Sequence, residues 1–349
     1  MRIFVVGTGQ LDSAAMSCEV ALRSLGHEVA LFDPDAYPRP VAAFRNTYLA
    51  KAYVNTALQL AGVYQRLFER SLLSEIARFQ PDVVLVIPIF SVGIEAVARL
   101  KRRGVKVAGW FQDAVSNMGS HKFLLADYDG LFFKDPYIVD RLRDGAGLEH
   151  VHYLPEACEP TTHHSLPLTP ADRERYGCEL AVYGNLYAYR ARVLEHVLDY
   201  DLNIYGHKPS RWMTPALVAR WRGYPVFYED KIRAVLAAKI CLSTSHYAEV
   251  QSANARIFEI AGIGGFQVAD APGVPEFFEP GTEIVTFKGP RQLREVIHHY
   301  LAHPEERTEI ARRGQLRAHR DHTFAKRLRQ LLTVIGLTDA EAAPALQNV

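Results

Sequence analysis

The chain has 349 residues, of which 48% are hydrophobic and 23% are charged, and its formal net charge is +1. The composition is typical of a soluble globular protein, and the length favours two domains over a single core. The near-zero net charge gives no electrostatic reason to expect nucleic-acid binding. No apolar run approaches the ~18 residues of a membrane span, and the chain opens on a strand and a turn, not on a signal peptide. We therefore expect a cytoplasmic protein with at most a peripheral membrane contact.

The cysteines and the paired histidines show no spacing typical of a metal site or a disulfide framework. The four cysteines are widely scattered: Cys18, Cys158, Cys178 and Cys241. The histidine pairs lack a third ligand at a suitable spacing: His163-His164, His298-His299 and His319-x-x-His322. The sequence therefore predicts no metal site and a reducing compartment.

The first half of the chain alternates continuous apolar segments with amphipathic ones. Strands are predicted over residues 3–6, 28–32, 82–87, 105–110, 130–133 and 152–154, and helices over 14–25 and 94–101. Residues 41–79 have helical periodicity with many polar positions, which predicts one or two further helices. Because buried strands separated by helices are typical of parallel sheets, we expect a doubly wound α/β domain.

A proline-rich stretch separates this half from a second alternating region. Residues 155–175 contain four prolines and no periodicity, which indicates a domain boundary. After it, strands are predicted over 179–183, 202–205, 240–243, 265–268 and 284–286, and helices over 189–197, 231–237, 291–301 and 305–332. We predict Rossmann-like domains at residues 1–160 and 178–335, a linker at 161–177 and a disordered tail from residue 336.

A glycine-containing loop follows the first predicted strand. Gly7-Thr8-Gly9-Gln10-Leu11-Asp12 begins like a dinucleotide-binding fingerprint. Asp12, however, stands where glycine or alanine is needed for close packing of helix and strand, so we disfavour NAD binding. Open α/β sheets bind ligands at the carboxyl ends of their strands, so Gly7 and Gly9 are candidate contacts for a substrate.

An acid and a histidine follow the fourth predicted strand at the same edge. Asp113 can act as a general base if its geometry and pKa suit, or it can cap the following turn. The sequence leaves both roles open. His121, a few residues later, is the second catalytic candidate.

In the second half, glycines and an arginine occupy the corresponding edge. Gly184-Asn185 and Gly206 allow a ligand to approach the backbone closely. Arg190 and Arg192 begin the helix after Asn185, and one of them could neutralise a phosphate, although exposed helical arginines often serve solubility alone. Two further candidate ligand contacts are Tyr205, at the end of one predicted strand, and Ser245, just after another.

Residues 252–268 form the most informative stretch of the chain. They are predicted to form a loop, a short helix that ends at Gly264-Gly265, and a buried strand. Arg256 lies in the first turn of the helix, where the dipole favours anions, and a bound diphosphate would remove that conflict. Glu259 is three residues further on the same side and could accept hydrogen bonds from the two hydroxyls of a ribose. The alternative is a surface ion pair between the two.

The last predicted helices are basic. Between Lys288 and Arg329 there are 11 Lys and Arg against 5 Asp and Glu. This excess fits a solvated helix face, or attraction to an anionic acceptor or membrane surface.

Several motifs of this chain recur together in one known family. They are Asn254-x-Arg256-x-Phe258-Glu259-Ile260-Ala261-x-x-Gly264-Gly265, Phe277-Phe278-x-x-Gly281-x-Glu283, Trp110-Phe111-Gln112-Asp113 and Leu154-Pro155-Glu156. With these motifs the chain resembles the GT-B glycosyltransferases, and more closely their CgeB-like, spore-maturation branch. The resemblance covers most of the chain and is most specific from about residue 224 to residue 330.

This resemblance implies two Rossmann-like domains facing a cleft, with the C-terminal helices packing back toward the N-terminal domain. It also implies that the C-terminal domain binds a nucleotide-sugar donor, with Glu259 on the ribose, Arg256 on the diphosphate and Asn254 in support. Many such enzymes carry a further glutamate eight residues before the ribose-binding one. Here Gln251 occupies that position and Glu249 lies two residues earlier, so the chain departs from the retaining Glu-x7-Glu pattern.

The function implied is metal-independent transfer of a sugar from a nucleotide-diphosphate sugar to a glycan, lipid-linked or protein acceptor. No cofactor beyond the nucleotide-sugar co-substrate is expected. The alternative is a catalytically degenerate GT-B protein that binds or assembles in surface-polysaccharide or coat biogenesis. In that case the donor would bind without being turned over.

Overall fold

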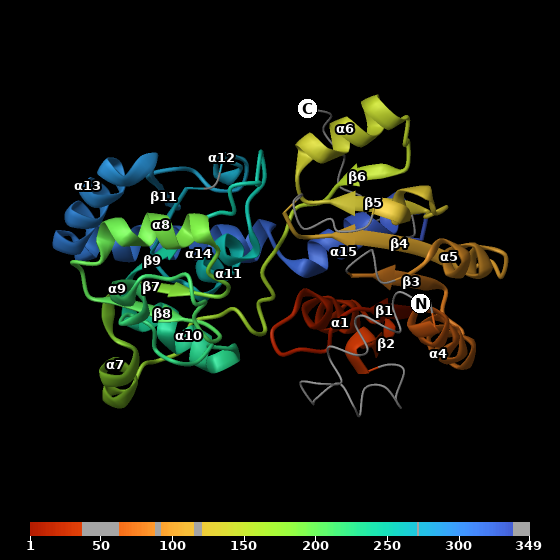
Figure 1. Cartoon of the computed structure of the whole chain (residues 1–349), viewed down its shortest axis with the longest axis horizontal. Helices are drawn as coiled ribbons and strands as arrows, with labels where there is room; N and C mark the ends of the chain where they lie inside the picture. Colours follow the sequence, from red (N-terminus) through yellow and green to blue (C-terminus); the bar gives the residue numbers. More distant parts are fainter. Residues whose placement is uncertain (37–62, 88–91, 115–120, 271, 338–349) are drawn as a thin grey trace. The chain divides into compact units, whose positions relative to one another are not determined.

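The computed structural model describes residues 1–36, 63–87, 92–114, 121–270 and 272–337. The chain divides into two compact units. Unit 1 contains residues 1–133, 138–154 and 328–349, and unit 2 contains residues 134–137 and 155–327. Figure 1 shows a sheet flanked by helices in each unit. The predicted helical segment at 41–62 and most of the predicted tail lie outside the described residues, and the predicted domain boundaries stay a prediction.

Unit 1 is built on a six-stranded, all-parallel sheet. The strands are β1 (Arg2–Val6), β2 (Glu28–Phe32), β3 (Val83–Val86), β4 (Lys106–Phe111), β5 (Gly130–Phe133) and β6 (Val151–Tyr153). Their order is β2-β1-β3-β4-β5-β6, so the direction of winding changes at β1. β3 and β5 are buried along their whole length, because helices cover both faces of the sheet. The predicted doubly wound arrangement is confirmed.

The helices of unit 1 are α1 (Ala14–Ser24), α4 (Val63–Phe79), α5 (Ile94–Lys101), most of α6 (Pro136–Ala146) and the end of α15 (Phe324–Val334). Two short 3-10 turns, η1 (Pro34–Ala36) and η5 (His121–Leu125), follow β2 and β4. The Ser13 hydroxyl accepts a hydrogen bond from the Met16 amide and so caps α1. Leu328 onward groups with unit 1, where a Cβ on Gly130 would lie 2.9 Å from Ile335. This confirms that the C-terminal helix returns to the first unit.

Unit 2 contains a second parallel sheet, with strand order β11-β10-β9-β7-β8. The strands are β7 (Cys178–Tyr183), β8 (Leu202–Tyr205), β9 (Ala238–Ser243), β10 (Gln267–Ala269) and β11 (Val285–Thr286). The helices are α7 (Pro170–Tyr176), α8 (Ala188–Leu194), α9 (Pro215–Val218), α10 (Tyr228–Ala237), α11 (Ala255–Ile263), α12 (Val274–Phe277), α13 (Gly289–Ala302) and α14 (Pro304–Asp321); η6 (Glu195–Val197) extends α8. Side chains of α8 and α13 pack on one face of the sheet, and those of α10 and α11 on the other.

One helix was not predicted, and one predicted helix was wrong. The predicted linker contains α7, whose start is fixed by a capping box in which Thr169 and Asp172 bond each other's backbone amides. A helix of 7 residues is too short to show periodicity. The predicted helix 305–332 is two helices, α14 and α15. They break because the Cys158 amide donates to the His322 carbonyl and the Phe324 amide donates to the Cys158 carbonyl, which removes both groups from the helical pattern.

Gly264 ends α11 with a backbone conformation that favours glycine. Its φ is +89°, and a Cβ there would lie 2.9 Å from Ser165 Oγ and 3.0 Å from Gln315 Nε2. Gly281 has a similar φ of +84° but nothing within 4 Å of such a Cβ. We expect Gly281→Ala to lower the free energy of unfolding by about 1 kcal/mol through backbone strain, and Gly264→Ala by about 2–3 kcal/mol because the neighbours must also move. Urea unfolding of the full chain tests this, and equal losses would contradict it.

Candidate functional site

The loop between β9 and α11 carries buried polar side chains at the start of a helix. Asn254 is the N-cap of α11, yet its side chain makes no capping hydrogen bond, and the first turn has no acidic residue. Within the described part of the chain, neither amide atom of Asn254 nor the Ser252 hydroxyl has a hydrogen-bond partner, although all are buried. Unpaired buried polar groups are costly, and the free amides of a helix start attract anions. The arrangement therefore fits an anionic ligand.

Arg256 reaches from α11 to the turn that follows β7. Its Nη2 donates to the Thr244 carbonyl at 3.3 Å, and its Nε is buried without a partner among the described residues. Gly184 has a φ of +89°, and a Cβ there would lie 3.3 Å from Arg256 Nη1. The guanidinium therefore lies against the exposed backbone of the Gly184-Asn185 turn. Two of the predicted ligand-binding segments are brought together in this way.

A second guanidinium lies close to the first. Arg190 is fully buried, and its Nε donates to Thr244 Oγ1 at 2.9 Å while Nη1 donates to the Asn185 carbonyl. Burial, and then the charge of Arg256, hold the pKa of Arg190 well below its usual value, against the partial compensation of Asp270. Neither arginine forms an ion pair with a carboxylate in the described ranges. Positive charge is therefore concentrated at the carboxyl edge of β7 and β9 and is only partly compensated, by Asp270.

Glu259, by contrast, is held by neighbours of its own. The Tyr183 hydroxyl donates to Glu259 Oε2 at 2.9 Å, and Lys231 Nζ lies 3.1 Å from the same oxygen. The side chain of Lys231 is 3% exposed and that of Glu259 is 15% exposed. Burial, followed by the Glu259 charge, keeps the pKa of Tyr183 well above its usual value, so the tyrosine stays a donor. The alternative of a surface ion pair with Arg256 is therefore wrong.

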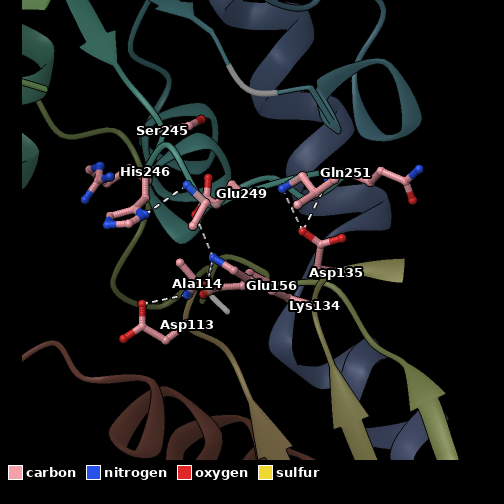
Figure 2. Close-up of polar contacts among 12 residues, drawn as sticks. Asp113, Ala114, Lys134, Asp135, Glu156, Ser245, His246, Glu249 and Gln251 are labelled. Carbon is pink, nitrogen blue, oxygen red and sulfur yellow. Dashed lines mark hydrogen bonds and ion pairs between the residues drawn. The ribbon is translucent and has the colours of Figure 1, made fainter. Parts of the chain in front are cut away.

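A third cluster fixes the loop before α11 (Figure 2). Lys134 Nζ lies 2.8 Å from Glu249 Oε1 and 3.4 Å from Glu156 Oε1, and all three side chains are less than a tenth exposed. Asp135 Oδ2 accepts hydrogen bonds from the amides of Val250 and Gln251, at 3.0 and 3.2 Å. The segment after β5 thus ties down the 249–251 loop through both side chains and backbone.

The carboxyl group of Glu156 has an unusual pKa. Burial, together with the charges of Glu249 and Glu259, raises it to about 7, although Lys134 acts in the opposite direction. Glu249 Oε2 is buried and has no hydrogen-bond partner in the part of the chain that the structure describes. A ligand hydroxyl could satisfy that oxygen.

The remaining predicted contacts of unit 2 differ in their access to a ligand. Tyr205 is fully buried and packs against the rings of Tyr176 and Tyr224, so it belongs to the core and its prediction as a ligand contact is wrong. Gly206 packs against Trp221, whose Nε1 donates to its carbonyl at 3.2 Å. The Ser245 amide donates to Asp270 Oδ1 at 2.6 Å.

A cavity makes the turn after β7 accessible. Its volume is about 440 Å³, and its lining includes Gly184, Asn185, Lys208, Trp212 and Trp221. It lies at the carboxyl ends of β7 and β8, where open α/β sheets bind ligands. The predicted approach of a ligand to the glycine turn is therefore sterically possible.

In unit 1 the candidates lie at the carboxyl ends of β1 and β4. A Cβ on Gly7 would collide with the Ile87 carbonyl, and one on Gly9 would lie 3.1 Å from Asp33. Asp113 is exposed, and its Oδ1 accepts a hydrogen bond from the adjacent Ala114 amide at 2.8 Å. A capping side chain accepts from an amide two or three residues further on, so the catalytic role and the capping role of Asp113 both stay predictions. His121 begins η5, but its side chain lies outside the described residues.

Four residues of these clusters were not predicted from the sequence: Lys134, Asp135, Tyr183 and Lys231. Lys134-Asp135 directly follows β5, just as Asp113 follows the end of β4, so the same strand-end argument would have found this pair. Tyr183 and Lys231 gave no local signal, because a tyrosine in a strand and a lysine in a helix are ordinary. Only the packing of β7, α10 and α11 brings them to Glu259.

Two further predictions concern the surface and the cysteines. Most arginines of α13 and α14 face nearby acids, as in the pairs of Arg294 with Asp199 and of Arg312 with Glu309, which favours the solvated-face interpretation. All four cysteines are buried free thiols. None of the described helices combines the length and the apolar composition that a bilayer crossing requires. Cytoplasmic location and peripheral membrane contact stay predictions.

Comparison with known proteins agrees with this geometry. Residues 169–333 match the model of a family described as glycosyl transferase-like. No curated protein matches the sequence significantly. A sucrose-phosphate synthase from Thermosynechococcus elongatus superposes with a TM-score of 0.68 at 12% identity, covering 95% of this chain and 98% of that one.

Two other solved structures match to a similar extent. Anabaena Alr3699/HepE, in complex with UDP and glucose, gives a TM-score of 0.64 at 11% identity over 96% of this chain and 99% of that one. A glycosyltransferase from Rickettsia africae gives 0.62 at 13% identity over 96% and 97%. At such low identity these matches establish the fold alone. The chain therefore has the GT-B fold of glycosyltransferases, and its residues 169–333 match the glycosyl transferase-like family.

Proposed function

We propose that the protein is a glycosyltransferase that moves a sugar from a nucleoside-diphosphate sugar to a glycan, lipid-linked or protein acceptor. The observation that carries the proposal is the pair of guanidinium groups of Arg190, in α8, and Arg256, in the first turn of α11, which lie close together and form no ion pair with a carboxylate of the described residues. A diphosphate supplies the missing negative charge and accepts hydrogen bonds from the arginine and the helix amides.

The same groups suit the chemistry of transfer. Breaking the bond between the anomeric carbon and the diphosphate builds positive charge on the sugar and negative charge on the leaving group. Arg256 and the start of α11 stabilise the leaving diphosphate where its charge develops. Arg190 is fully buried and donates a hydrogen bond to Thr244. Its positive charge adds to the electrostatic stabilisation of the diphosphate without direct contact. This division of labour requires no metal ion on the diphosphate.

We assign Glu259 to the ribose of the donor. Tyr183 and Lys231 both contact its Oε2, so the orientation of the carboxylate is fixed before the ligand arrives. A carboxylate in that state accepts hydrogen bonds from vicinal hydroxyls. The Anabaena neighbour was solved with UDP-glucose, which makes a uridine nucleotide the first donor to test.

We assign Glu249 to the transferred sugar. Gln251, at the position where related enzymes often carry a glutamate, is exposed. Glu249 is instead buried against Lys134, and its Oε2 lacks a partner within the described ranges. A hydroxyl of the transferred sugar would donate the missing hydrogen bond to Glu249 Oε2. Asp113 is the candidate base of an inverting reaction; in a retaining reaction it would only position the acceptor.

A binding or assembly protein without turnover is the second candidate. The exposed Gln251 and the bond of Asp113 to its neighbouring amide favour it. Incubation with UDP-, GDP- and dTDP-sugars separates the two functions, because an enzyme releases the nucleoside diphosphate, at least slowly to water. Binding without release on any acceptor would support the second candidate, and no binding would contradict both.

Arg256→Ala should weaken UDP binding by about 10- to 100-fold, because a hydrogen bond to a charged group contributes about 1.5–3 kcal/mol. Arg192→Ala is the matched control. Arg192 is an exposed arginine of α8 that pairs with Glu195, so its loss should change the affinity by less than about twofold. Isothermal titration calorimetry measures both. Equal effects of the two variants would refute the diphosphate site.

The ribose assignment is tested by comparing UDP with 2′-deoxy-UDP. We expect wild type to prefer UDP by about tenfold, the value of one good hydrogen bond to a charged acceptor. Glu259→Gln should remove most of that preference, because the neutral amide is a weaker acceptor, while still accepting from Tyr183. An unchanged preference in a variant that unfolds at the wild-type temperature would sink the assignment.

Glu156 should make stability depend on pH. Its pKa is about 7 in the folded protein and 4.5 as an ordinary glutamate, so the folded state binds the proton more tightly. The free energy of unfolding should therefore fall as pH rises from 4.5 through 7, by at most about 3 kcal/mol from this group. Glu156→Gln should remove that fall in urea unfolding. Glu295→Gln, an exposed glutamate of α13 paired with Arg291, should not alter it; the same slope in both variants would contradict the prediction.

A further inference from the structure

We propose that the junction of α13 and α14 binds a late divalent transition-metal ion, with Zn²⁺ as the physiological candidate. The ligands are His299, His303 and Glu306. One ligand atom from each lies within 4.8 Å of the others, and all three side chains are exposed. Small rotations of exposed side chains bring such atoms to the ~2.0–2.2 Å from a shared ion that zinc requires.

The local sequence explains why the three side chains meet. His299 and His303 are four residues apart at the end of α13, so they share one face, and their rings stack with centroids 4.1 Å apart. Pro304 begins α14 immediately afterwards and turns the chain. The turn brings Glu306 back, with its Oε2 3.1 Å from His299 Nε2.

The tautomer of His303 is already that of a metal ligand. Its Nδ1 lies 2.6 Å from the His299 carbonyl oxygen. A carbonyl only accepts, so Nδ1 carries the proton and Nε2 keeps a lone pair for an ion. Histidines that bind metals use such a hydrogen bond to a carbonyl or carboxylate to fix their orientation. In His299, by the same argument, Nε2 carries the proton that the Glu306 carboxylate accepts, so an ion that binds there displaces this proton.

The ligand set selects the ion. Two imidazole nitrogens and one carboxylate oxygen suit Zn²⁺, Co²⁺, Ni²⁺ or Cu²⁺, whereas Ca²⁺ and Mg²⁺ prefer oxygen ligands alone. Water would complete a tetrahedral shell. No metal site was predicted because the adjacent histidines have no third ligand at a suitable spacing; His299, His303 and Glu306 meet only through the turn between α13 and α14.

The site is separate from the proposed transfer reaction. α13 begins just after β11, and Arg294 in its middle bonds His196 and Asp199, which precede β8, so its last turn lies toward the amino ends of the strands. α11 begins at the carboxyl ends. The ion would therefore clamp two helices together and take no part in bond breaking, and its presence or absence is independent of the proposed function.

Titration of the full chain, prepared without a polyhistidine tag, tests the proposal. Co²⁺ should bind at one ion per chain with the visible absorption of a tetrahedral site, and Zn²⁺ should displace it. His303→Ala and Glu306→Gln should each weaken Zn²⁺ binding by about tenfold or more. His298→Ala removes an exposed neighbouring histidine outside the cluster and should leave the affinity unchanged. Zn²⁺ should raise the unfolding temperature of wild type but not of His303→Ala.

The proposal is overturned if no tetrahedral Co²⁺ spectrum appears, or if wild type and both ligand variants bind Zn²⁺ equally. It is also overturned if His298→Ala loses binding as strongly as His303→Ala. All four side chains are exposed, so these variants should fold normally, and circular dichroism verifies this.

Discussion

The proposed ligand site of unit 2 depends on the repulsion between two neighbouring arginines. Arg190 is buried without a carboxylate partner in the described structure, and the charge of Arg256 lowers its pKa further. Such an arrangement costs free energy unless a ligand supplies negative charge. Thr244 binds both side chains, one through its hydroxyl and one through its carbonyl, so the start of the 244–254 loop sets the distance between the charges. The geometry of the proposed diphosphate site follows from that one residue.

The buried carboxylates of the same region form ion pairs with lysines. Lys134 pairs with Glu249 and Glu156, and Lys231 pairs with Glu259. Lysines therefore compensate the buried carboxylates, and the arginines are left for the ligand. Arginine suits that task, because its planar fork matches phosphate oxygens and it stays charged when partly buried. The carboxylates keep fixed orientations for the hydroxyls of a ribose or a sugar.

Site residues that depend on local sequence patterns could be predicted, whereas those whose partners are far away in the sequence could not. Arg256, Glu259 and Asn254 could be proposed from the sequence because they lie at the start or in the first turns of a short, amphipathic helix that ends at glycine. The Gly184-Asn185 turn could be proposed because strand ends of parallel sheets share an edge. Tyr205 was misplaced, because a strand-end tyrosine points either toward the ligand or into the core, and the alternation alone does not say which. Lys134 and Lys231 were missed, since each meets its partner only across long sequence separations.

The sequence by itself determined the two parallel sheets, most helix and strand positions and the glycine-terminated helix that presents Arg256. Those features depend on local patterns: apolar runs, helical periodicity and stop signals. Tertiary structure alone decided which charges are paired, where the C-terminal helix breaks at His322 and how His299, His303 and Glu306 meet. These outcomes depend on the spatial meeting of segments, such as Cys158 with Thr323, which a linear pattern does not encode.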